Sequence, residues 1–99
     1  MDIKAILERE LQDYAGEGAN GHGTLTRSED GREFSIIVHA TARQKQFTFM
    51  SLSVSIENDL IIIHQDRNDP ALADTLMQVG IPREKIILGY MGESMPVGA

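Results

Sequence analysis

The 99-residue chain contains no cysteine. Without thiols it cannot form disulfides, hold zinc through thiolates or use a cysteine nucleophile. Long hydrophobic runs are also missing: the longest aliphatic run, Leu60 to Ile63, is far short of the ~20 residues that cross a bilayer. Acidic residues interrupt the apolar residues near the N-terminus, which argues against a signal peptide. These features predict a cytoplasmic protein with no membrane segment.

Basic residues are scarce as well. Nine Lys and Arg stand against fifteen Asp and Glu, which gives a net charge of −6. Nucleic-acid binding draws most of its affinity from basic side chains on phosphates, and a net negative molecule is repelled by DNA at long range. The one local basic pair, Arg43 and Lys45, is typical of a solvated loop. We therefore expect no direct DNA binding.

The composition that remains is that of an ordinary soluble globule. Hydrophobic residues make up 41% of the chain and charged residues 24%. A chain of this length predicts a single domain over residues 1–99 with one modest core.

The first fifteen residues predict a helix. Residues 2–15 carry an apolar stripe at helical spacing, Asp2 is placed to cap the first turn, and Gly16 is placed to end the helix. Residues 16–23 hold four glycines and little to bury, so we expect a mobile surface loop there.

The middle of the chain shows β patterns. We expect strands near residues 24–28 and over 33–41, 46–56 and 60–65, joined by turns at 29–32, 43–45 and 58–59. In the third strand the alternation places Met50 and Leu52 on the apolar face, and it places Phe47 and Phe49 on the opposite, serine-bearing face. Either a bulge switches the faces, or something covers that end of the outer face.

The last third predicts a second helix and a strand. Asp69 is a favourable N-cap, Pro70 suits the first helical position, and Gly80 ends the helix. The expected apolar face consists of Leu72, Leu76 and Val79, supported by Ala73 and Met77. A final strand begins at Ile86, and residues 91–99 are expected to form a loose tail.

This order of elements predicts an α+β fold. It comprises an N-terminal helix, an antiparallel β-meander of about four strands, a second helix and a final strand. The helices are expected to pack on one face of the sheet.

The motifs that could carry chemistry are weak. Residues 16–21 match G-x-G-x-x-G, but they follow a helix instead of a strand, and Glu17 would repel phosphates. The histidines lack the local spacing of metal ligands, although His39 and His64 could lie on neighbouring strands. Ser51, Ser53 and Ser55 sit in no nucleophile elbow and suit a solvated strand face. We predict no catalytic, cofactor or metal site, and thus no enzyme.

One polar turn has two interpretations that remain open. Residues 64–69 join the last strand of the meander to the second helix. The turn could simply cap the helix through Asp69, or it could be a recognition loop at the end of a central strand.

From about residue 33 to residue 90 the chain resembles the XisI family, the fdxN element excision controlling factor proteins. The similarity is strongest in IENDLIIIHQDRNDPALADTLMQVGIPREKIILGY, residues 56–90. Members of that family carry a run of the type D-I-x-x-G-K-I-W-I-Q-x-D-G-T-E, an I-A-x-E-L helix and G-V-P-K-x-D-I-V-L-G-F. The matching positions here are Ile56, Ile61, Ile63, Asp66, Leu72, Ala73, Leu76, Gly80, Ile81, Pro82, Ile86, Leu88, Gly89 and Tyr90. The family's Trp position falls on Ile62 and its Gln position on His64.

The resemblance implies an accessory role in the excision of a DNA element. Such proteins act with a XisH-like, nuclease-type partner and a recombinase, and an acidic protein complements the basic surface of a DNA-acting one. The residues that we expect to contact the partner are Phe47, Phe49, His64, Asp66 and Arg67. Alternatives are a structural homo-oligomer that uses the same patch, a small-ligand-binding module, or a small enzyme that uses His39 or His64.

Overall fold

The computed structural model describes residues 2–18 and 20–94. The elements in this part of the chain are α1 (Ile3–Tyr14), β1 (Gly16–Glu17), β2 (Gly21–Arg27), β3 (Glu33–Ala42), β4 (Lys45–Glu57), β5 (Leu60–Asp66), α2 (Leu72–Gln78), η1 (Arg83–Lys85), β6 (Ile86–Leu88) and η2 (Gly89–Met91). The strands form one sheet in sequence order, antiparallel except for the parallel pair β5–β6. The predicted α+β fold is therefore confirmed, with β1 as an additional strand.

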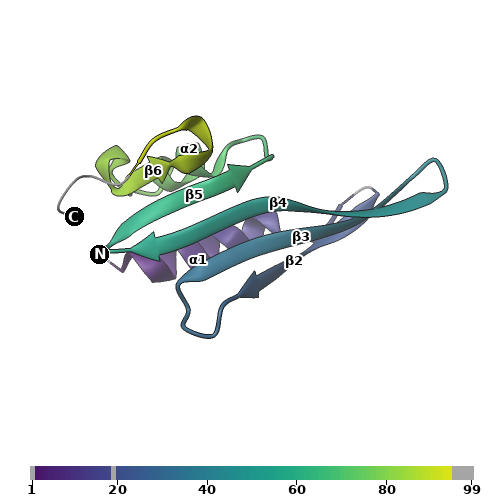
Figure 1. The fold of residues 1–99 in the computed structure, drawn as a ribbon, viewed down its shortest axis with the longest axis horizontal. Coiled ribbons are helices and arrows are strands. Elements are labelled where there is room, and N and C mark those ends of the chain that lie inside the picture. The colour runs from purple at the N-terminus through teal and green to yellow at the C-terminus, as the bar shows by residue number, and fades with distance from the viewer. Residues whose placement is uncertain (1, 19, 95–99) are drawn as a thin grey trace.

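Both helices pack on the same face of the sheet (Figure 1). The main core lies between them and that face, and it includes Leu7, Leu11, Phe34, Ile36, Leu52, Val54, Ile61, Ile63, Leu72, Leu76, Ile81 and Ile86. A smaller cluster of Leu60, Ile62 and Ile87 forms on the other face. Strand β5 thus buries apolar side chains on both faces, as its uninterrupted aliphatic run predicts.

The glycine-rich segment after α1 does not form the mobile loop that we expected. Gly16 pairs with Gly23 and Glu17 pairs with His22, so the segment builds a small hairpin on the edge of the sheet. A Cβ at Gly21 would overlap the carbonyl oxygen of His39 on β3. The glycine is therefore needed for close approach of two backbones, which composition alone does not distinguish from flexibility.

The start of α2 also differs from the prediction. The helix begins at Leu72 with Ala71 in the capping position, and Asp69 makes no capping bond to it. The Asp66 carboxylate instead accepts a hydrogen bond from the Leu72 N–H at 2.7 Å and another from the Asn68 N–H at 2.9 Å. An aspartate six residues upstream, at the end of β5, therefore caps the helix.

The end of α2 follows the predicted pattern. Gly80 has φ +104°, and the Ile81 N–H returns to the Leu76 carbonyl at 3.0 Å, with Ile81 buried. Val79 and Met77, expected on the apolar face, are exposed instead. The helix ends at Gln78, so Val79 lies just past it, while Met77 lies within it on the exposed side.

Hydrogen bonds fix the segment that follows β6 against the preceding residues. The Glu93 carboxylate accepts hydrogen bonds from the Leu88 N–H at 2.8 Å and from the Arg83 guanidinium at 2.6 Å. The loose tail predicted for residues 91–99 is therefore wrong for residues 91–93, and residues 95–99 lie outside the described part.

The molecule is elongated, with extents of 49 × 27 × 25 Å. Its length comes from the hairpin of β3 and β4, which continues past the C-terminal end of α1 (Figure 1). We call residues 39–48 the arm. The arm reverses in a two-residue turn at Arg43 and Gln44, whose φ angles of 52° and 66° fit the twist of a tight hairpin. None of the helices in the described part of the chain is long and apolar enough to span a membrane.

Candidate partner-binding groove

A β-bulge at Ser51 decides where the two phenylalanines lie. Ile36 pairs with Leu52, but the next residue, Ile37, pairs with Met50, so Ser51 is the extra residue of β4. The bulge switches the alternation, which is the first of the two arrangements that the sequence left open.

The switch places Phe47 and Phe49 on the face that the helices cover. They stand opposite Ala40 and Val38, which belong to the same face as the core residue Ile36. The expectation of an outer-face aromatic patch is therefore wrong. Met50, which was expected on the core face, points to the outer face and is 38% exposed.

Because α1 ends near Gly23, the helix face of the sheet is left open beyond it. A groove of about 670 Å³ occupies this place. Its floor includes Val38, Ala40, Phe47 and Phe49, and one wall is formed by the end of α1 and the glycine hairpin. Arg67 and Asn68, which follow β5, line another part of it. We call it the arm groove.

The aromatic pair forms the apolar centre of the arm groove. The Phe47 and Phe49 rings are stacked, with centroids 5.9 Å apart and an interplanar angle of 17°. The Arg67 guanidinium lies over the Phe49 ring, 4.8 Å from its centroid, which is cation–π geometry. Phe47 remains 45% exposed. An exposed aromatic next to a planar cation can receive both an apolar group and a carboxylate.

Backbone contacts hold Arg67 in this position. Its N–H donates to the Ser51 carbonyl at 2.9 Å, so the bulge residue of β4 fixes the first residue after β5. The Asn68 side-chain amide accompanies it, donating to the Asp66 carboxylate at 3.0 Å. The bulge that turns the phenylalanines toward the groove therefore also positions the cation beside them.

Tyr14 closes the wall between the two helices. Its hydroxyl donates to the Pro70 carbonyl at 2.9 Å and lies 2.7 Å from the Thr75 hydroxyl. Burial raises the pKa of the Tyr14 phenol, and the hydrogen bond with Thr75 opposes part of that rise. Tyr14 therefore stays neutral at physiological pH, and its hydroxyl ties the end of α1 to Pro70 and to Thr75 of α2.

Charges of both signs surround the groove. Asp13 and Glu17 line the side of α1 and β1, whereas Arg67 lines the opposite side, near β5. Acidic and basic side chains around an apolar floor suit a peptide-like partner that carries charges of both signs.

The five residues expected to contact a partner divide into two groups. The structure brings Phe47, Phe49 and Arg67 together in the arm groove. Asp66 instead turns toward α2 and caps it. His64 is exposed on the outer face, where its Nε2 lies 2.7 Å from the Ser55 hydroxyl.

Sequence reasoning missed the remaining parts of the groove. Val38 and Ala40 were placed on the correct face of β3 but were not connected with the aromatic pair. Tyr14 and Asn68 carry no local signal of this role. The cluster of glycines after α1 is the one visible signal, because it marks the wall where backbones approach closely.

The serines and histidines do not assemble into a catalytic or metal site within residues 2–18 and 20–94. Ser51 and Ser55 are buried, contrary to the expected solvated row. His39 pairs with His22 on β2 and is separated from His64 by the whole of β4. No group of three or more His, Asp or Glu side chains in these residues is spaced to hold a metal ion.

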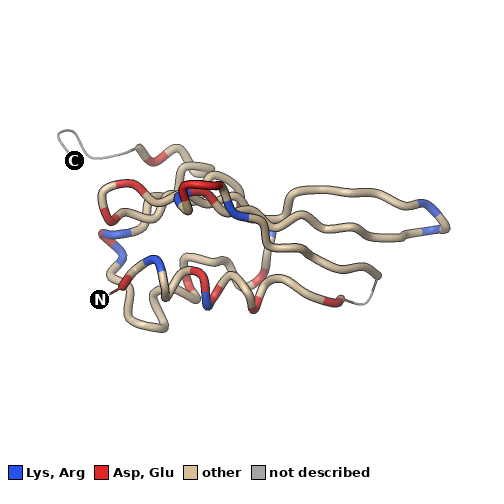
Figure 2. Tube along the Cα trace, turned by 90° about the horizontal axis from the view of Figure 1, so that it is seen from below, with Lys and Arg blue, Asp and Glu red and all other residues tan. Residues whose placement is uncertain are grey.

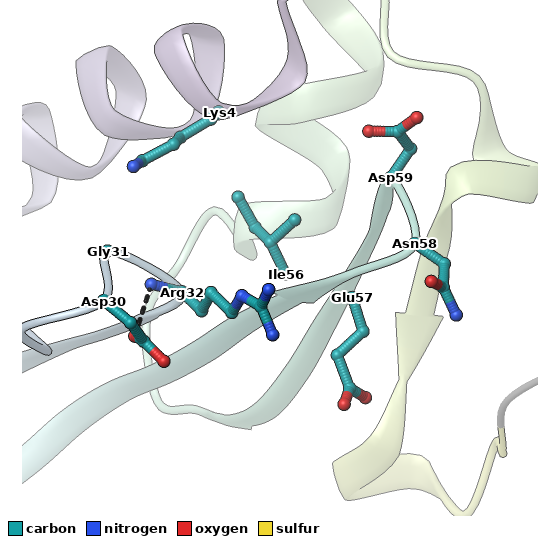
Figure 3. A pocket seen from close by; sticks show the side chains of 8 residues that line it. All are labelled: Lys4, Asp30, Gly31, Arg32, Ile56, Glu57, Asn58 and Asp59. Carbon is teal, nitrogen blue, oxygen red and sulfur yellow. Dashed lines mark hydrogen bonds between the residues drawn. The ribbon is translucent and has the colours of Figure 1, made fainter.

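A second concavity, of about 450 Å³, lies at the opposite end of the sheet. Lys4 projects from α1 over the turn that contains Asp30 and Gly31, while Glu57 and Asp59 lie around the β4–β5 turn (Figure 3). Hydrogen bonds from Ser28 and the Arg32 N–H lower the pKa of Asp30. Closing the turn accounts for Asp30, and the lining otherwise shows mixed charges with little apolar surface.

Comparison with known proteins agrees with this architecture. The XisI protein family matches residues 2–96. The fold is similar to that of the fdxN element excision controlling factor XisI from Anabaena variabilis ATCC 29413, with a TM-score of 0.66 and 20% identity over 88% of each chain. It is also similar to a XisI-like protein from the same organism, with a TM-score of 0.65 and 20% identity over 88% of this chain and 79% of that one.

No curated protein matches the sequence. The family match nevertheless spans nearly the whole chain and includes α1, the glycine hairpin, the arm and α2. The chain therefore belongs to the XisI family.

Proposed function

We propose that this chain is a non-catalytic accessory protein that helps control excision of a DNA element by binding a XisH-like, nuclease-type protein. The family of the chain, named for excision control, supports the process. The arm groove supports the mode of action, because it offers a surface for contact with another protein.

The observation that carries this proposal is the exposed aromatic pair with its cation. Phe47 and Phe49 could be packed under a longer α1, but the helix ends at Tyr14 and leaves Phe47 45% exposed. Aromatic residues, including phenylalanine, and arginine are enriched at protein–protein interfaces. Their convergence in one concave place favours the arm groove over the mixed-charge concavity at the other end.

The charge distribution favours a protein partner over direct contact with DNA. The chain has a net charge of −6, and the groove is bordered by Asp13 and Glu17 as well as Arg67. Nucleases that approach DNA carry basic surfaces, which an acidic partner attracts and orients. We infer that the chain contacts the protein component of the excision machinery.

The test is co-purification of the tagged chain from its host, with the bound proteins identified by mass spectrometry. We expect a nuclease-type protein in stoichiometric amount with the wild type. The double variant Phe47→Ser and Phe49→Ser should lose it, because the apolar floor of the groove is removed. Arg67→Ala should weaken the complex, and Arg67→Lys should restore less than full binding because the planar stack is lost.

The matched control is Met50→Ser. Met50 lies on the same strand and is 38% exposed, similar to Phe47, but it points to the outer face. This variant should keep the partner. Loss of the partner with Met50→Ser but not with the double variant would show that the contact surface is the outer face and would contradict the proposal.

A further inference from the structure

Strand β4 has an open edge along the arm. Its pairing with β5 begins only at Leu52, and the Arg67 N–H closes the edge at the Ser51 carbonyl. In the part of the chain that the structure describes, no strand lies beside residues 45–50 on that side. This open edge is distinct from the arm groove, which lies on the face of the sheet.

Backbone groups alternate between the two edges of a strand. Lys45 flanks the two-residue turn and pairs with Ala42, so Lys45, Phe47 and Phe49 direct their N–H and C=O groups toward β3. Gln46, Thr48 and Met50 direct theirs toward the open edge. Met50 agrees with this assignment, because its carbonyl accepts a hydrogen bond from the Gln65 side chain on the β5 side.

Apart from Lys45 beside the turn, this edge lacks the features by which proteins protect exposed strands. The stretch from Gln46 to Ile56 contains no charged residue and no proline, and the extra residue of β4 is Ser51, outside the open part. A neutral edge with apolar side chains and free backbone groups is a template for pairing with another strand. Figure 2 shows the basic residues of the hairpin confined to its tip.

We propose that a second copy of this chain occupies the open edge, forming a two-fold antiparallel β4–β4 junction centred on Phe47. Residues 45–49 of one copy would pair with residues 49–45 of the other, and Gln46 would exchange backbone hydrogen bonds with Thr48 of the partner copy. The proposal does not depend on the function proposed above, because it uses the strand edge and not the groove.

The length of the open edge selects this register. The turn at Arg43 and Gln44 limits the arm at one end, and Arg67 bonded to Ser51 limits it at the other. A two-fold axis at Phe47 lets each turn stop beside Met50 of the other copy. With an axis at Thr48, the turn of each copy would clash with Arg67 of the other copy. With an axis closer to the turn, fewer residues would be paired.

Charge complementarity supports a second copy as the occupant. In this register the basic turn of one copy, with Arg43 and Lys45, ends beside the β5–α2 loop of the other. Asp66 at the end of β5 and Asp69 in that loop outnumber the single cation Arg67. The paired segments themselves are neutral between Gln46 and Phe49, so the net charge of −6 on each copy is not concentrated at the junction.

A single engineered cysteine tests the register, since the chain has no cysteine of its own. Phe47→Cys would face itself across the two-fold axis in a non-hydrogen-bonded pair, whose Cα atoms lie about 4.5 Å apart, within reach of a disulfide. Mild oxidation should therefore yield a covalent dimer. Phe49→Cys, which would face Lys45, should stay monomeric on a denaturing gel. Equal crosslinking of both variants, or of neither, would overturn the proposal.

Sedimentation velocity over a range of concentrations provides the non-covalent test. The wild type should convert from monomer to dimer as its concentration rises. Thr48→Pro should remain monomeric, because it removes an N–H that faces the open edge and is not needed for pairing with β3. Thr48→Ala keeps that N–H and should still dimerise. Unfolding curves should show that all three proteins fold. A wild type that is monomeric throughout, or a Thr48→Pro variant that dimerises normally, would overturn the proposal.

Discussion

The two halves of the sheet meet different surroundings. Around β5 the helices cover one face, and Leu52, Ile61 and Ile63 lie fully buried beneath them. Along the arm, neither α1 nor α2 covers the same sheet, and Phe47 and Thr48 are exposed. One pair of strands, β3 and β4, runs through both halves. The difference shows that apolar residues in the covered half maintain the fold, whereas those in the arm are available for contact.

The largest effect should come from removing a side chain in the covered half. Leu76 on α2 has no exposed surface. Leu76→Ala should lower the free energy of unfolding by about 2–5 kcal/mol, because it removes transfer energy and leaves a cavity. Urea denaturation measures this change. Its neighbour Met77 is 37% exposed, so Met77→Ala should change the unfolding free energy by about 0.5 kcal/mol or less.

A smaller effect is expected where β5 meets α2. Asp66→Ala removes the acceptor of the Leu72 N–H and of the Asn68 N–H and should cost about 1–3 kcal/mol of unfolding free energy. Asp69→Ala is the control, and it should have little effect. If Asp69→Ala destabilises the protein more than Asp66→Ala, the assignment of the cap to Asp66 is wrong.

The arm should respond weakly to the same kind of truncation. Phe47→Ala removes a large ring, but one that is 45% exposed and stacked on Phe49. We expect a loss of about 1 kcal/mol or less in unfolding free energy, measured in urea beside Leu76→Ala. A loss as large as that of Leu76→Ala would erase the distinction between the two halves.

The smallest effect concerns how the stability of the fold changes with acid pH. It comes from Glu93, which is bound near β6 in the covered half of the molecule. Hydrogen bonds from the Leu88 N–H and then from Arg83 lower the pKa of Glu93 below its ordinary value of 4.5. The stabilisation that ionised Glu93 provides is therefore complete above the pH that equals this ordinary value. It disappears as the pH falls through the pKa that Glu93 has in the folded protein.

The Glu93→Gln variant should accordingly be less stable than the wild type near neutral pH. As the pH falls below about 4.5, the variant should lose less of its stability than the wild type does. Thermal unfolding along a pH series measures this slope. Glu84→Gln, an exposed carboxylate in η1, should leave the slope unchanged. Equal slopes for the wild type and Glu93→Gln would contradict the role assigned to Glu93.

The comparison of the two halves also explains how much the sequence could predict. In the covered half, helical spacing found α1 and strand alternation found β3, because each has one apolar face against the core. Uninterrupted aliphatic residues found β5 and the final strand, which bury side chains on both faces. The cap of α2 was missed because Asp69 has the better local position, while Asp66 reaches the helix only after the chain has folded back from β5.

In the arm and next to it, Phe47 and Phe49 were found but placed on the wrong face. Strand alternation is a local rule, and one extra residue at Ser51 reverses it for every residue before the bulge. The groove itself depends on where α1 ends relative to the hairpin, which is a tertiary relation with no local signal. The residue types of the site could thus be predicted from the sequence, but the place in the fold where they come together could not.

Hydrogen–deuterium exchange of the chain, alone and with the co-purified partner, tests the central claim most directly. The claim predicts that the partner adds protection over residues 45–51 and over the glycine hairpin that forms the wall of the arm groove. Residues 60–63, buried in both states, should not change. Added protection confined to the opposite end, around Lys4, Asp30 and Glu57, would contradict the claim that the arm half of the sheet makes the contact.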